Sequence, residues 1–346
     1  MVSVIVPARN EEASLGACLE SLVGQEGVDF EVIVVDDASS DRTRAIAESF
    51  SDVSVVEART LASGWSGKSN AMFSGAQQAR GKWLLFTDAD TVHKPGSLAG
   101  GVREAESFSA ALLSYSPEQE IHGFWQSAVM AVIFAELACT YRPRLVCDMR
   151  SPVAAANGQY MLALREKYFE ALENPAVRES LLEDVAMARA VKSSGAKIRF
   201  RLGADAVRTR MYRSFGDLRD GWTKNLALLF PAAGRLAVMR LVEFVLIVAA
   251  STAAFYSGMR GAIVSAILAI AIAAGVSSSF LLRVRNAHFG WRANLGALLG
   301  LPLFAWLLLR SRSAHRRGEV MWKGRSYGGE RQIPRGLKPA RNDNIG

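Results

Sequence analysis

Short apolar runs alternate with more polar segments over the first 90 residues. The apolar runs are rich in β-branched residues and have the length of buried strands; they cover residues 2–6, 30–35, 53–56 and 82–87. The segments between them are predicted helices, at residues 12–23, 39–50 and 69–79. This alternation predicts an α/β fold in which a mostly parallel sheet is flanked by helices on both faces.

The long uncharged runs all lie between residues 241 and 309. Runs 242–256 and 261–282, interrupted only by Glu243, approach the roughly 20 residues that a membrane-spanning helix needs. Run 295–309 is shorter, about 22 Å as a helix, and contains Pro302. Half of the 346 residues are apolar, and the mean hydropathy of +0.13 is high for a wholly soluble enzyme. We therefore expect an integral membrane protein with a water-soluble catalytic part.

Basic residues determine the expected orientation. The net charge of +8 is concentrated after residue 282, where arginines flank the apolar runs. A nucleic-acid-binding arm is one interpretation, but such flanking favours cytosolic loops and anionic membrane lipids, with no nucleic acid partner. We expect residues 1–230 in the cytosol, because the chain enters its first strand without a signal-like segment. Spans at about 241–258 and 261–282 follow, then a re-entrant or short third span at 295–309 in a 231–310 membrane domain, and a basic cytosolic tail at 311–346.

Two further apolar stretches, 124–141 and 215–230, carry few charges. Each is either a core helix or a helix that lies on the membrane surface. The three cysteines are scattered and form no Cys-x-x-Cys motif. We therefore expect reduced, mostly buried thiols.

Two aspartates, Asp88 and Asp90, close the fourth predicted strand. The carboxyl ends of strands are where α/β sheets bind their ligands. Neighbouring carboxylates repel each other unless they share a cation, and Mg²⁺ or Mn²⁺ held by such a pair commonly binds a phosphate-bearing substrate as well. The alternative for an isolated Asp-x-Asp is a solvated acidic turn.

Other candidate residues recur at similar places. Asp36 and Asp37 follow the second predicted strand, and Glu183 and Asp184 open a predicted helix, where the helix dipole alone favours acids. Downstream, the segment 219–225 brings Arg219, Trp222 and Lys224 within two helical turns. Cations there can neutralise a diphosphate, and an indole can stack on a sugar or a lipid.

Two nucleotide-binding motifs are excluded. The sequence Gly67-Lys68-Ser69 lacks the first glycine of a P-loop, since Ala62 occupies that position. No Gly-x-Gly-x-x-Gly follows the first strand, which disfavours a dinucleotide-dependent dehydrogenase. Lys68 still lies at a predicted helix start, from which it can reach a phosphate. Of the four histidines only His93 is near the acidic pair, and it is more typical of a solvated loop than of a metal ligand.

Four segments in order resemble the successive motifs of family 2 glycosyltransferases, which are inverting enzymes of the GT-A fold. They are Val6-Pro7-Ala8-Arg9-Asn10-Glu11-Glu12, Val35-Asp36-Asp37-Ala38-Ser39-Ser40-Asp41-Arg42-Thr43, the Asp88-x-Asp90 pair and Glu183-Asp184. Their order and spacing cover residues 1–230. The loop at 64–68, Arg219-x-x-Trp222, the late apolar pair and Trp322-Lys323-Gly324-Arg325-Ser326-Tyr327 resemble a membrane-anchored subgroup that includes hopanoid-associated and carotenoid-acid glycosyltransferases.

The resemblance implies transfer of a sugar from a nucleotide-sugar, most often a UDP-sugar, to a lipid or isoprenoid hydroxyl or carboxyl group at the cytoplasmic membrane. It places Asp37 at the uracil or ribose, beside the loop that holds Pro7, Arg9 and Glu11. It also places Asp88 at the donor, Asp88 and Asp90 on a divalent metal ion, and Lys68 and Arg219 at the diphosphate. Inversion needs one acceptor-side base; Asp184 is the first candidate and Glu183 the second. Trp222 is expected in the acceptor pocket.

One departure limits this resemblance. The Gln-x-x-Arg-Trp signature of processive polysaccharide synthases is replaced by Arg-Asp-Gly-Trp at 219–222, and no multi-span channel is present. Processive polymer extrusion is therefore disfavoured. Two alternatives stay open: a polyprenyl-phosphate glycosyltransferase, whose phosphate acceptor needs more cation and less base, and a catalytically degenerate membrane scaffold.

Overall fold

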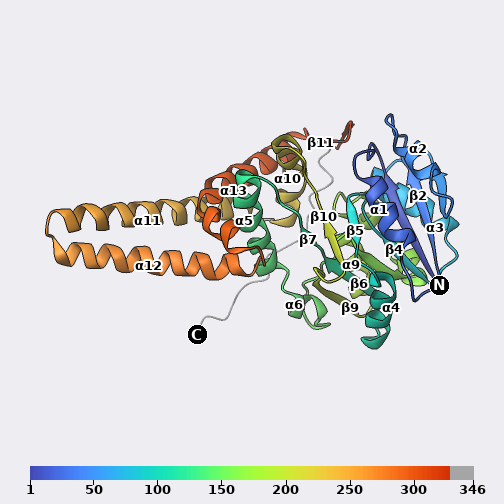
Figure 1. Cartoon of the computed structure of the whole chain (residues 1–346), viewed down its shortest axis with the longest axis horizontal. Coiled ribbons are helices and arrows are strands. Elements are labelled where there is room, and N and C mark those ends of the chain that lie inside the picture. The colour runs from blue at the N-terminus through green and yellow to red at the C-terminus, as the bar shows by residue number, and fades with distance from the viewer. Residues whose placement is uncertain (328–346) are drawn as a thin grey trace.

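The computed structural model of the chain describes residues 1–327 and contains an α/β body built on a seven-stranded sheet (Figure 1). The strands lie in the order β3-β2-β1-β4-β8-β6-β9. Their bounds are β1 (Val2–Ala8), β2 (Phe30–Asp36), β3 (Val53–Glu57), β4 (Trp83–Phe86), β6 (Leu112–Ser116), β8 (Met161–Leu164) and β9 (Ile198–Leu202). The helices of the body are α1 (Leu15–Val23), α2 (Thr43–Glu48), α3 (Gly67–Gln78), α4 (Ser97–Ser107), α6 (Pro143–Cys147), α7 (Arg165–Leu172), α8 (Pro175–Glu179) and α9 (Glu183–Ser193).

The predicted α/β class is confirmed. Strand β1 pairs in parallel with β2 and β4, and β2 pairs in parallel with β3. Strand β8 is the exception, because it runs antiparallel to both β4 and β6. The parallel half therefore brings the carboxyl ends of β1, β2 and β4 to one edge of the sheet. A smaller sheet, in the order β5 (Thr91–His93), β10 (Val207–Thr209) and β7 (Glu118–Gln119), lies beside it.

Alternating strand residues fill the two faces of the main sheet. In β1, Ile5 belongs to one buried cluster, whereas Val4 and Val6 belong to the cluster on the opposite face. This alternation follows from the two-residue period of a strand. Burial of each such side chain contributes about 1.5–3 kcal/mol. The apolar runs that predicted strands are thus buried on both sides, as helix-covered parallel strands require.

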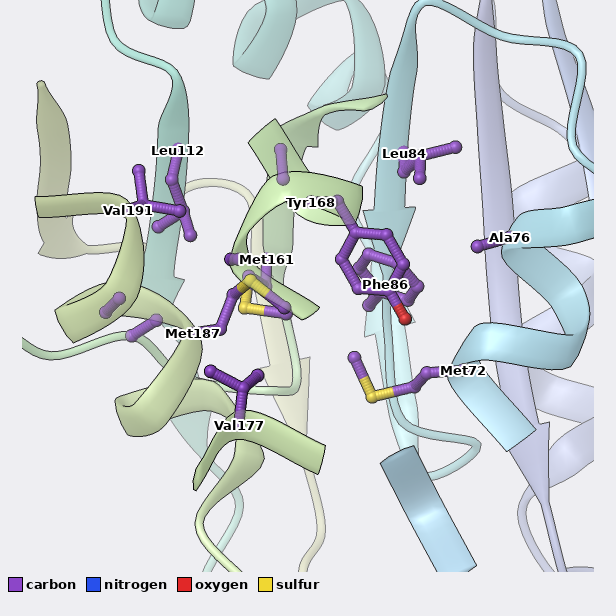
Figure 2. Close-up of a cluster of buried hydrophobic side chains, with 14 of the residues drawn as sticks. Met72, Ala76, Leu84, Phe86, Leu112, Met161, Tyr168, Val177, Met187 and Val191 are labelled. Atoms are coloured by element: carbon purple, nitrogen blue, oxygen red, sulfur yellow. The ribbon is translucent and has the colours of Figure 1, made fainter. Parts of the chain in front are cut away.

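The first of these clusters is centred on an aromatic pair. The rings of Phe86 and Tyr168 lie 4.6 Å apart between centroids. Figure 2 shows Met161 and Met187 on one side of this pair and Met72 on the other. Because Phe86 is the last residue of β4, this packing fixes the strand end from which Asp88 follows.

Five long helices follow or interrupt the body: α5 (Phe124–Thr140), α10 (Phe215–Leu229), α11 (Ala233–Met259), α12 (Ile263–Arg285) and α13 (Trp291–Arg317). Helices α11 and α12 project from the body as an antiparallel pair, and α5, α10 and α13 lie between that pair and the sheet (Figure 1). Segments 124–147, 233–259, 263–285 and 293–317 are long and apolar enough to cross a membrane.

Burial separates these four segments into two kinds. Only 11% of the most apolar window of α11 and 17% of that of α12 is buried, so apolar side chains cover the surface of the projecting pair. The corresponding windows of 124–147 and 293–317 are 44% buried, because α5 and α13 pack against each other and against α10. An exposed apolar surface of this extent marks α11 and α12 as the segments suited to lipid.

Two differences from the sequence-based expectations concern this region. Helix α13 has 27 residues, about 40 Å at 1.5 Å per residue, so it is much longer than the apolar run 295–309, and it continues through Pro302. Stretch 124–141, expected as either a core helix or a membrane-surface helix, forms α5, whose middle is buried in the cluster with α13 while its first two residues are exposed. Residues 311–317, expected in a basic tail, are the last turns of α13, and the tail beyond residue 327 lies outside the described residues.

An ion cluster joins α5 to the projecting pair. Arg240 of α11 contacts Glu136 of α5 at 3.0 Å and Glu243 at 2.7 Å. Arg283 of α12 contacts the same two carboxylates at 3.0 and 2.6 Å. All four side chains are at most 15% exposed. Two cations balance two anions, which is what keeps such a buried group stable.

Candidate active site

Nearly all of the predicted site residues line one cavity of about 710 Å³. It opens at the carboxyl ends of β1, β2 and β4 and extends towards α5, α9 and α10. The predicted residues that line it are Pro7, Arg9, Glu11, Asp37, Lys68, Asp88, Asp90, Glu183, Asp184 and Trp222. The structure thus brings together acids that are separated by up to 173 residues of sequence, from Glu11 to Asp184.

Asp37 lies directly after β2. Its backbone amide bonds to the carbonyl of Ala8 at 2.9 Å, which extends the strand pairing by one residue. The next residue, Ala38, has a left-handed backbone with φ of 55°, so the chain turns sharply here. Arg9 donates from Nη1 to the Asp37 carbonyl at 2.7 Å. The two strand ends therefore form one continuous wall of the cavity.

Lys68 joins two of the acidic motifs. Its Nζ lies 2.7 Å from Asp88 Oδ1 and 2.7 Å from Glu183 Oε1. It is held at the second residue of α3, whose N-cap Ser66 accepts the amide of Ser69. The charges of Asp88 and Glu183 outweigh burial and raise the pKa of Lys68 well above its usual value. Lys68 is therefore a permanent cation at the centre of the site.

Asp184 is the best-placed acid for proton transfer. Its carboxylate accepts hydrogen bonds from the Gly158 amide at 3.0 Å and the Val185 amide at 2.7 Å. A Cβ at residue 158 would lie 2.8 Å from Lys68 Nζ, so a larger residue here would displace that ammonium group. Burial, with the Glu183 charge second, raises the pKa of Asp184 to about 6. A carboxylate that is ionised at neutral pH but still basic is suited to general-base catalysis.

Asp90 lines the cavity without an ion-pair partner in the described part of the chain. Burial, and then the charge of Asp88, raise its pKa to about 7. Two carboxylates that disfavour each other's charge form a donor set suited to a hard divalent cation. Among residues 1–327 no group of three or more His, Cys, Asp or Glu side chains gathers as a complete metal site. Further ligands would have to come from substrate and water.

A C-terminal hairpin forms part of the same cavity, which the sequence analysis did not predict. Strands β11 (Met321–Trp322) and β12 (Arg325–Ser326) are joined by Lys323 and Gly324. Both turn residues have positive φ, 46° and 76°, as a two-residue type I′ turn requires. From the sequence, residues 322–327 resemble a family motif but fall within the expected basic tail.

The hairpin contacts the site residues that lie nearest the N-terminus of the chain. Arg325 donates to both carboxylate oxygens of Asp37, at 2.5 and 2.8 Å. Lys323 donates to the Arg9 carbonyl at 3.0 Å and forms an ion pair with Glu11. Arg9 in turn donates to the Lys323 carbonyl at 3.1 Å. Residues 314 positions apart are thus linked by reciprocal hydrogen bonds.

We expect Gly67→Ala to release this hairpin. A Cβ at residue 67 would collide with Arg325 Nη1 and lie 3.4 Å from Asp37 Oδ2. The guanidinium is the flexible partner, so it should leave Asp37 while the fold stays intact. Loss of such a charge-assisted pair should speed amide hydrogen exchange in segment 320–327 by about tenfold or more, measured by mass spectrometry. Gly100→Ala on α4, where a Cβ meets open space, is the matched control. Equal exchange in both variants would contradict the expectation.

Two predicted site residues, Arg219 and Trp222, behave differently from the rest, and His93, expected in a solvated loop, is instead buried at the end of β5. Arg219 does not line the cavity; it pairs with the neighbouring Asp220 at 2.7 Å, so its predicted place at a diphosphate is not matched by this geometry. Trp222 is buried, and its Nε1 donates to Met130 Sδ at 3.3 Å, so it forms wall and not a free stacking surface. His93 hydrogen-bonds Thr87 and Ser97 inside the fold. Burial lowers the pKa of His93 to about 3, and it does not reach the acids.

The far part of the cavity is apolar. Its lining includes Phe134, Leu137, Ala138, Met211, Leu229 and Ala287, contributed by α5, α10 and the segments that follow β10 and α12. Two polar residues of α10, Lys224 and Asn225, line the cavity as well. Sequence reasoning noted Lys224 only as one of the basic residues of the segment. No local pattern distinguished it from Arg219.

Comparisons with known proteins agree with this architecture. The family described as "Glycosyl transferase family 2" matches residues 3–168. A 4,4'-diaponeurosporenoate glycosyltransferase of Staphylococcus aureus (strain MRSA252) is 28% identical over 341 residues, covering 94% of this chain and 88% of that protein. Its counterpart from strain USA300 is 26% identical over 339 residues, with the same coverage.

A solved structure shows the same fold. The mannosyltransferase PcManGT from Pyrobaculum calidifontis, in complex with GDP-Man and Mn²⁺, superposes with a TM-score of 0.53 at 19% identity. The superposition covers 90% of this chain and 86% of that one. Together with the ordered acidic motifs in one cavity, the family and relative matches support a family 2 glycosyltransferase, and the solved structure supports the GT-A fold.

Proposed function

We propose that this glycosyltransferase moves a sugar, with inversion, from a nucleotide-sugar to a lipid-soluble acceptor at the cytoplasmic membrane. One observation carries the proposal: a single cavity joins the strand-end acids to an apolar compartment beside helices long and apolar enough to cross a membrane. The relatives' names specify a diaponeurosporenoate, an apolar carboxylate, as the molecule glycosylated. We infer an acceptor of that kind here, with a hydroxyl or carboxyl group, and a UDP-sugar as donor.

The donor would occupy the end of the cavity nearest β1 and β2. Asp37 would hold the uracil or ribose, beside the loop of Pro7, Arg9 and Glu11. Lys68 is positioned between this end and the acids, where its charge would attract the diphosphate. Arg219 is not retained in this role. The gathering of every acidic motif in one cavity argues against the alternative of a degenerate scaffold.

Asp88 and Asp90 would hold the divalent metal ion, Mg²⁺ or Mn²⁺. The donor set fits, because such ions commonly take one or two carboxylates and complete their shell with substrate phosphate and water. Asp90 has no competing cation partner among the described residues. When bound, the ion would supply Lewis-acid stabilisation of the charge on the leaving diphosphate.

Asp184 would act as the base. It would accept the proton of the acceptor hydroxyl or carboxyl group while that oxygen attacks the anomeric carbon from the face opposite the diphosphate. The amides of Gly158 and Val185 fix the carboxylate orientation. Glu183 is the weaker candidate, because its carboxylate is occupied by Lys68.

The pKa of Asp184 gives an expected pH dependence. A base must be deprotonated to act, so kcat/KM should rise with pH through about 6 and level off above it. Glu183→Gln removes the like charge that raises this pKa and should shift the rise to lower pH. Initial rates between about pH 5 and about pH 8 would check both curves. A flat profile in this range would remove Asp184 from the proton transfer.

The projecting pair supports a membrane orientation. We propose that α11 and α12 cross the membrane, with the catalytic domain in the cytosol, α5 and α13 at the membrane interface and no third full crossing. Gly258→Cys, at the end of α11 where a side chain meets open space, should react with an impermeant thiol reagent applied outside cells. Asp52→Cys, in an exposed turn of the catalytic domain, should react only after permeabilisation. The reverse pattern would contradict this orientation.

The direct test is an assay of the full chain in detergent or nanodiscs. Labelled UDP-sugars and Mn²⁺ are supplied with a membrane lipid extract, and products are identified by mass spectrometry. The proposal expects a glycosylated, organic-soluble product. A protein that neither binds UDP or GDP with Mn²⁺ nor consumes any nucleotide-sugar would overturn it. A glycosylated polyprenyl phosphate would select the alternative acceptor.

A further inference from the structure

The cations that line the cavity differ in their partners. Lys68, Lys323 and Arg325 each contact a carboxylate within the site, and Arg9 lies 3.9 Å from Asp37. Lys224 and the exposed Arg142 contact no carboxylate in the described part of the chain. Lys224 is half-buried and lines the cavity. Such a cation is costly unless an anion joins it.

The backbone around Lys224 is fixed by α13. Ser311 donates to the Thr223 carbonyl at 2.6 Å and accepts the Ala227 amide at 2.9 Å. His315 Nε2 lies 2.8 Å from the Lys224 carbonyl. These contacts hold one side of α10 and leave the Lys224 side chain directed to the cavity, with Nζ 5.1 Å from the ring of Trp322. Lys224 is thus positioned at the cavity, although no carboxylate of the described chain forms an ion pair with it.

The neighbouring residue carries a second unsatisfied group. Asn225 Oδ1 is buried and has no hydrogen-bond partner in the described structure, and Asn225 lines the same cavity. Buried polar atoms in folded proteins are nearly always bonded. Two adjacent side chains without partners, both facing one cavity, indicate positions that a ligand completes.

We propose that Lys224 binds the reacting carboxylate of an acid-ended lipid acceptor. This assignment rests on the proposed function and selects, from its two acceptor groups, the carboxyl group. We assign Lys224 to the acceptor and not to the leaving diphosphate, because Lys68 already lies between Asp88 and Glu183, and because the helix that carries Lys224 also contributes the apolar Leu229 to the cavity lining.

The proposed reaction transfers one proton and one glycosyl group. A lipid acid leaves the membrane in its neutral form and gives its proton to Asp184. Lys224 stabilises the resulting carboxylate, which the negative charge of nearby Glu183 would otherwise repel, whereas Asp184 is now protonated and neutral. One carboxylate oxygen forms a bond to the anomeric carbon, the bond from that carbon to the diphosphate oxygen breaks, and the nucleoside diphosphate leaves with the electron pair. The product is a glycosyl ester.

The experiment compares an acid with its alcohol. Retinoic acid and retinol have the same apolar chain, and their affinity for the full-length protein with UDP and Mn²⁺ is measured by ligand-induced thermal shift. We expect wild type to bind the acid more tightly than the alcohol. Lys224→Gln should weaken acid binding by roughly 10- to 100-fold and leave retinol unchanged. Lys224→Arg should retain most of the preference, because it keeps the charge. Lys167→Gln, an exposed lysine paired with Glu170, is the matched control.

Three outcomes overturn the assignment. Wild type that binds the acid no better than the alcohol shows that the compartment has no carboxylate site. If Lys224→Gln still binds the acid more tightly than the alcohol, other residues form the carboxylate site. If Lys224→Gln binds UDP and Mn²⁺ more weakly but keeps its preference for the acid, Lys224 binds the diphosphate and not the acceptor. Failure of the proposed function is distinct, because it appears as wild type that binds neither UDP nor GDP with Mn²⁺.

Discussion

Asp184→Asn is expected to lower the transfer rate by roughly 10²- to 10⁴-fold, the contribution of a positioned general base. Asparagine keeps the size of the side chain and its acceptor oxygen for the Gly158 amide, so the site should keep its shape. Binding of UDP with Mn²⁺ should change little, because the role proposed for Asp184 is to accept a proton from the acceptor and not to hold the donor. Single-turnover rates and UDP affinity measured on the same preparation would separate the two effects.

Two further variants help to interpret the result for Asp184→Asn. Asp52→Asn changes an exposed aspartate outside the cavity and should leave the rate unaltered. Glu183→Gln should cost less than Asp184→Asn, because the main partner of Glu183 is Lys68 and not the acceptor. A fully active Asp184→Asn together with an inactive Glu183→Gln would transfer the role of the base to Glu183.

Asp90→Asn should abolish metal-dependent donor binding. The change removes one of the two carboxylates proposed to hold the ion, and Asp88 is already paired with Lys68. Because a bound metal contributes several kcal/mol to stabilising the leaving group, we expect at least about 100-fold lower kcat/KM. Titration of UDP affinity against Mn²⁺ should show no metal enhancement in the variant.

Chelation provides the complementary measurement. Wild type treated with EDTA should lose activity and regain it on addition of Mn²⁺ or Mg²⁺. The Asp90→Asn protein should respond to neither step. Full wild-type activity in EDTA would instead show that Asp88 and Asp90 serve another purpose.

The strand-end acids were predictable because their positions follow from the topology. Asp37 and Asp88 each come directly after a strand that reads as buried, and parallel strands bring such ends to one edge. Knowing the order of the strands was therefore enough to predict that these acids lie close to Lys68. Asp184 could be predicted only through the family resemblance. An acid in the first turn of a helix is also explained by the helix dipole alone, so its position did not by itself indicate a catalytic role.

The cationic side of the site was not predictable in the same way. Arg219 and Lys224 lie five residues apart on α10, which separates them by about 140° around the helix. Only one of them can face the cavity, and the choice depends on how Trp222 packs against α5. That packing is a tertiary contact with residues 130–134, and no spacing within the segment reveals it. Lys224 faces the cavity, and Arg219 does not.

Arg325 and Lys323 were missed for a related reason. Their partners Asp37 and Glu11 are separated from them by about 290 to 310 residues, and the intervening helices determine where the hairpin arrives. Composition alone made the segment look like part of a basic tail. The extent of α13 was also hidden, because its ends are polar and Pro302 interrupts the apolar pattern without breaking the helix.

The reciprocal bonds between Arg9 and Lys323 have a consequence for biogenesis. The first strand of the protein leaves the ribosome early, but the hairpin that completes its wall is among the last segments to be translated. The hairpin follows directly after α13 and reaches the cavity only when that helix has docked on α10. A nascent chain, or one whose helices have failed to insert, therefore lacks a finished donor pocket. Synthesis, insertion and competence for sugar transfer are completed in that order.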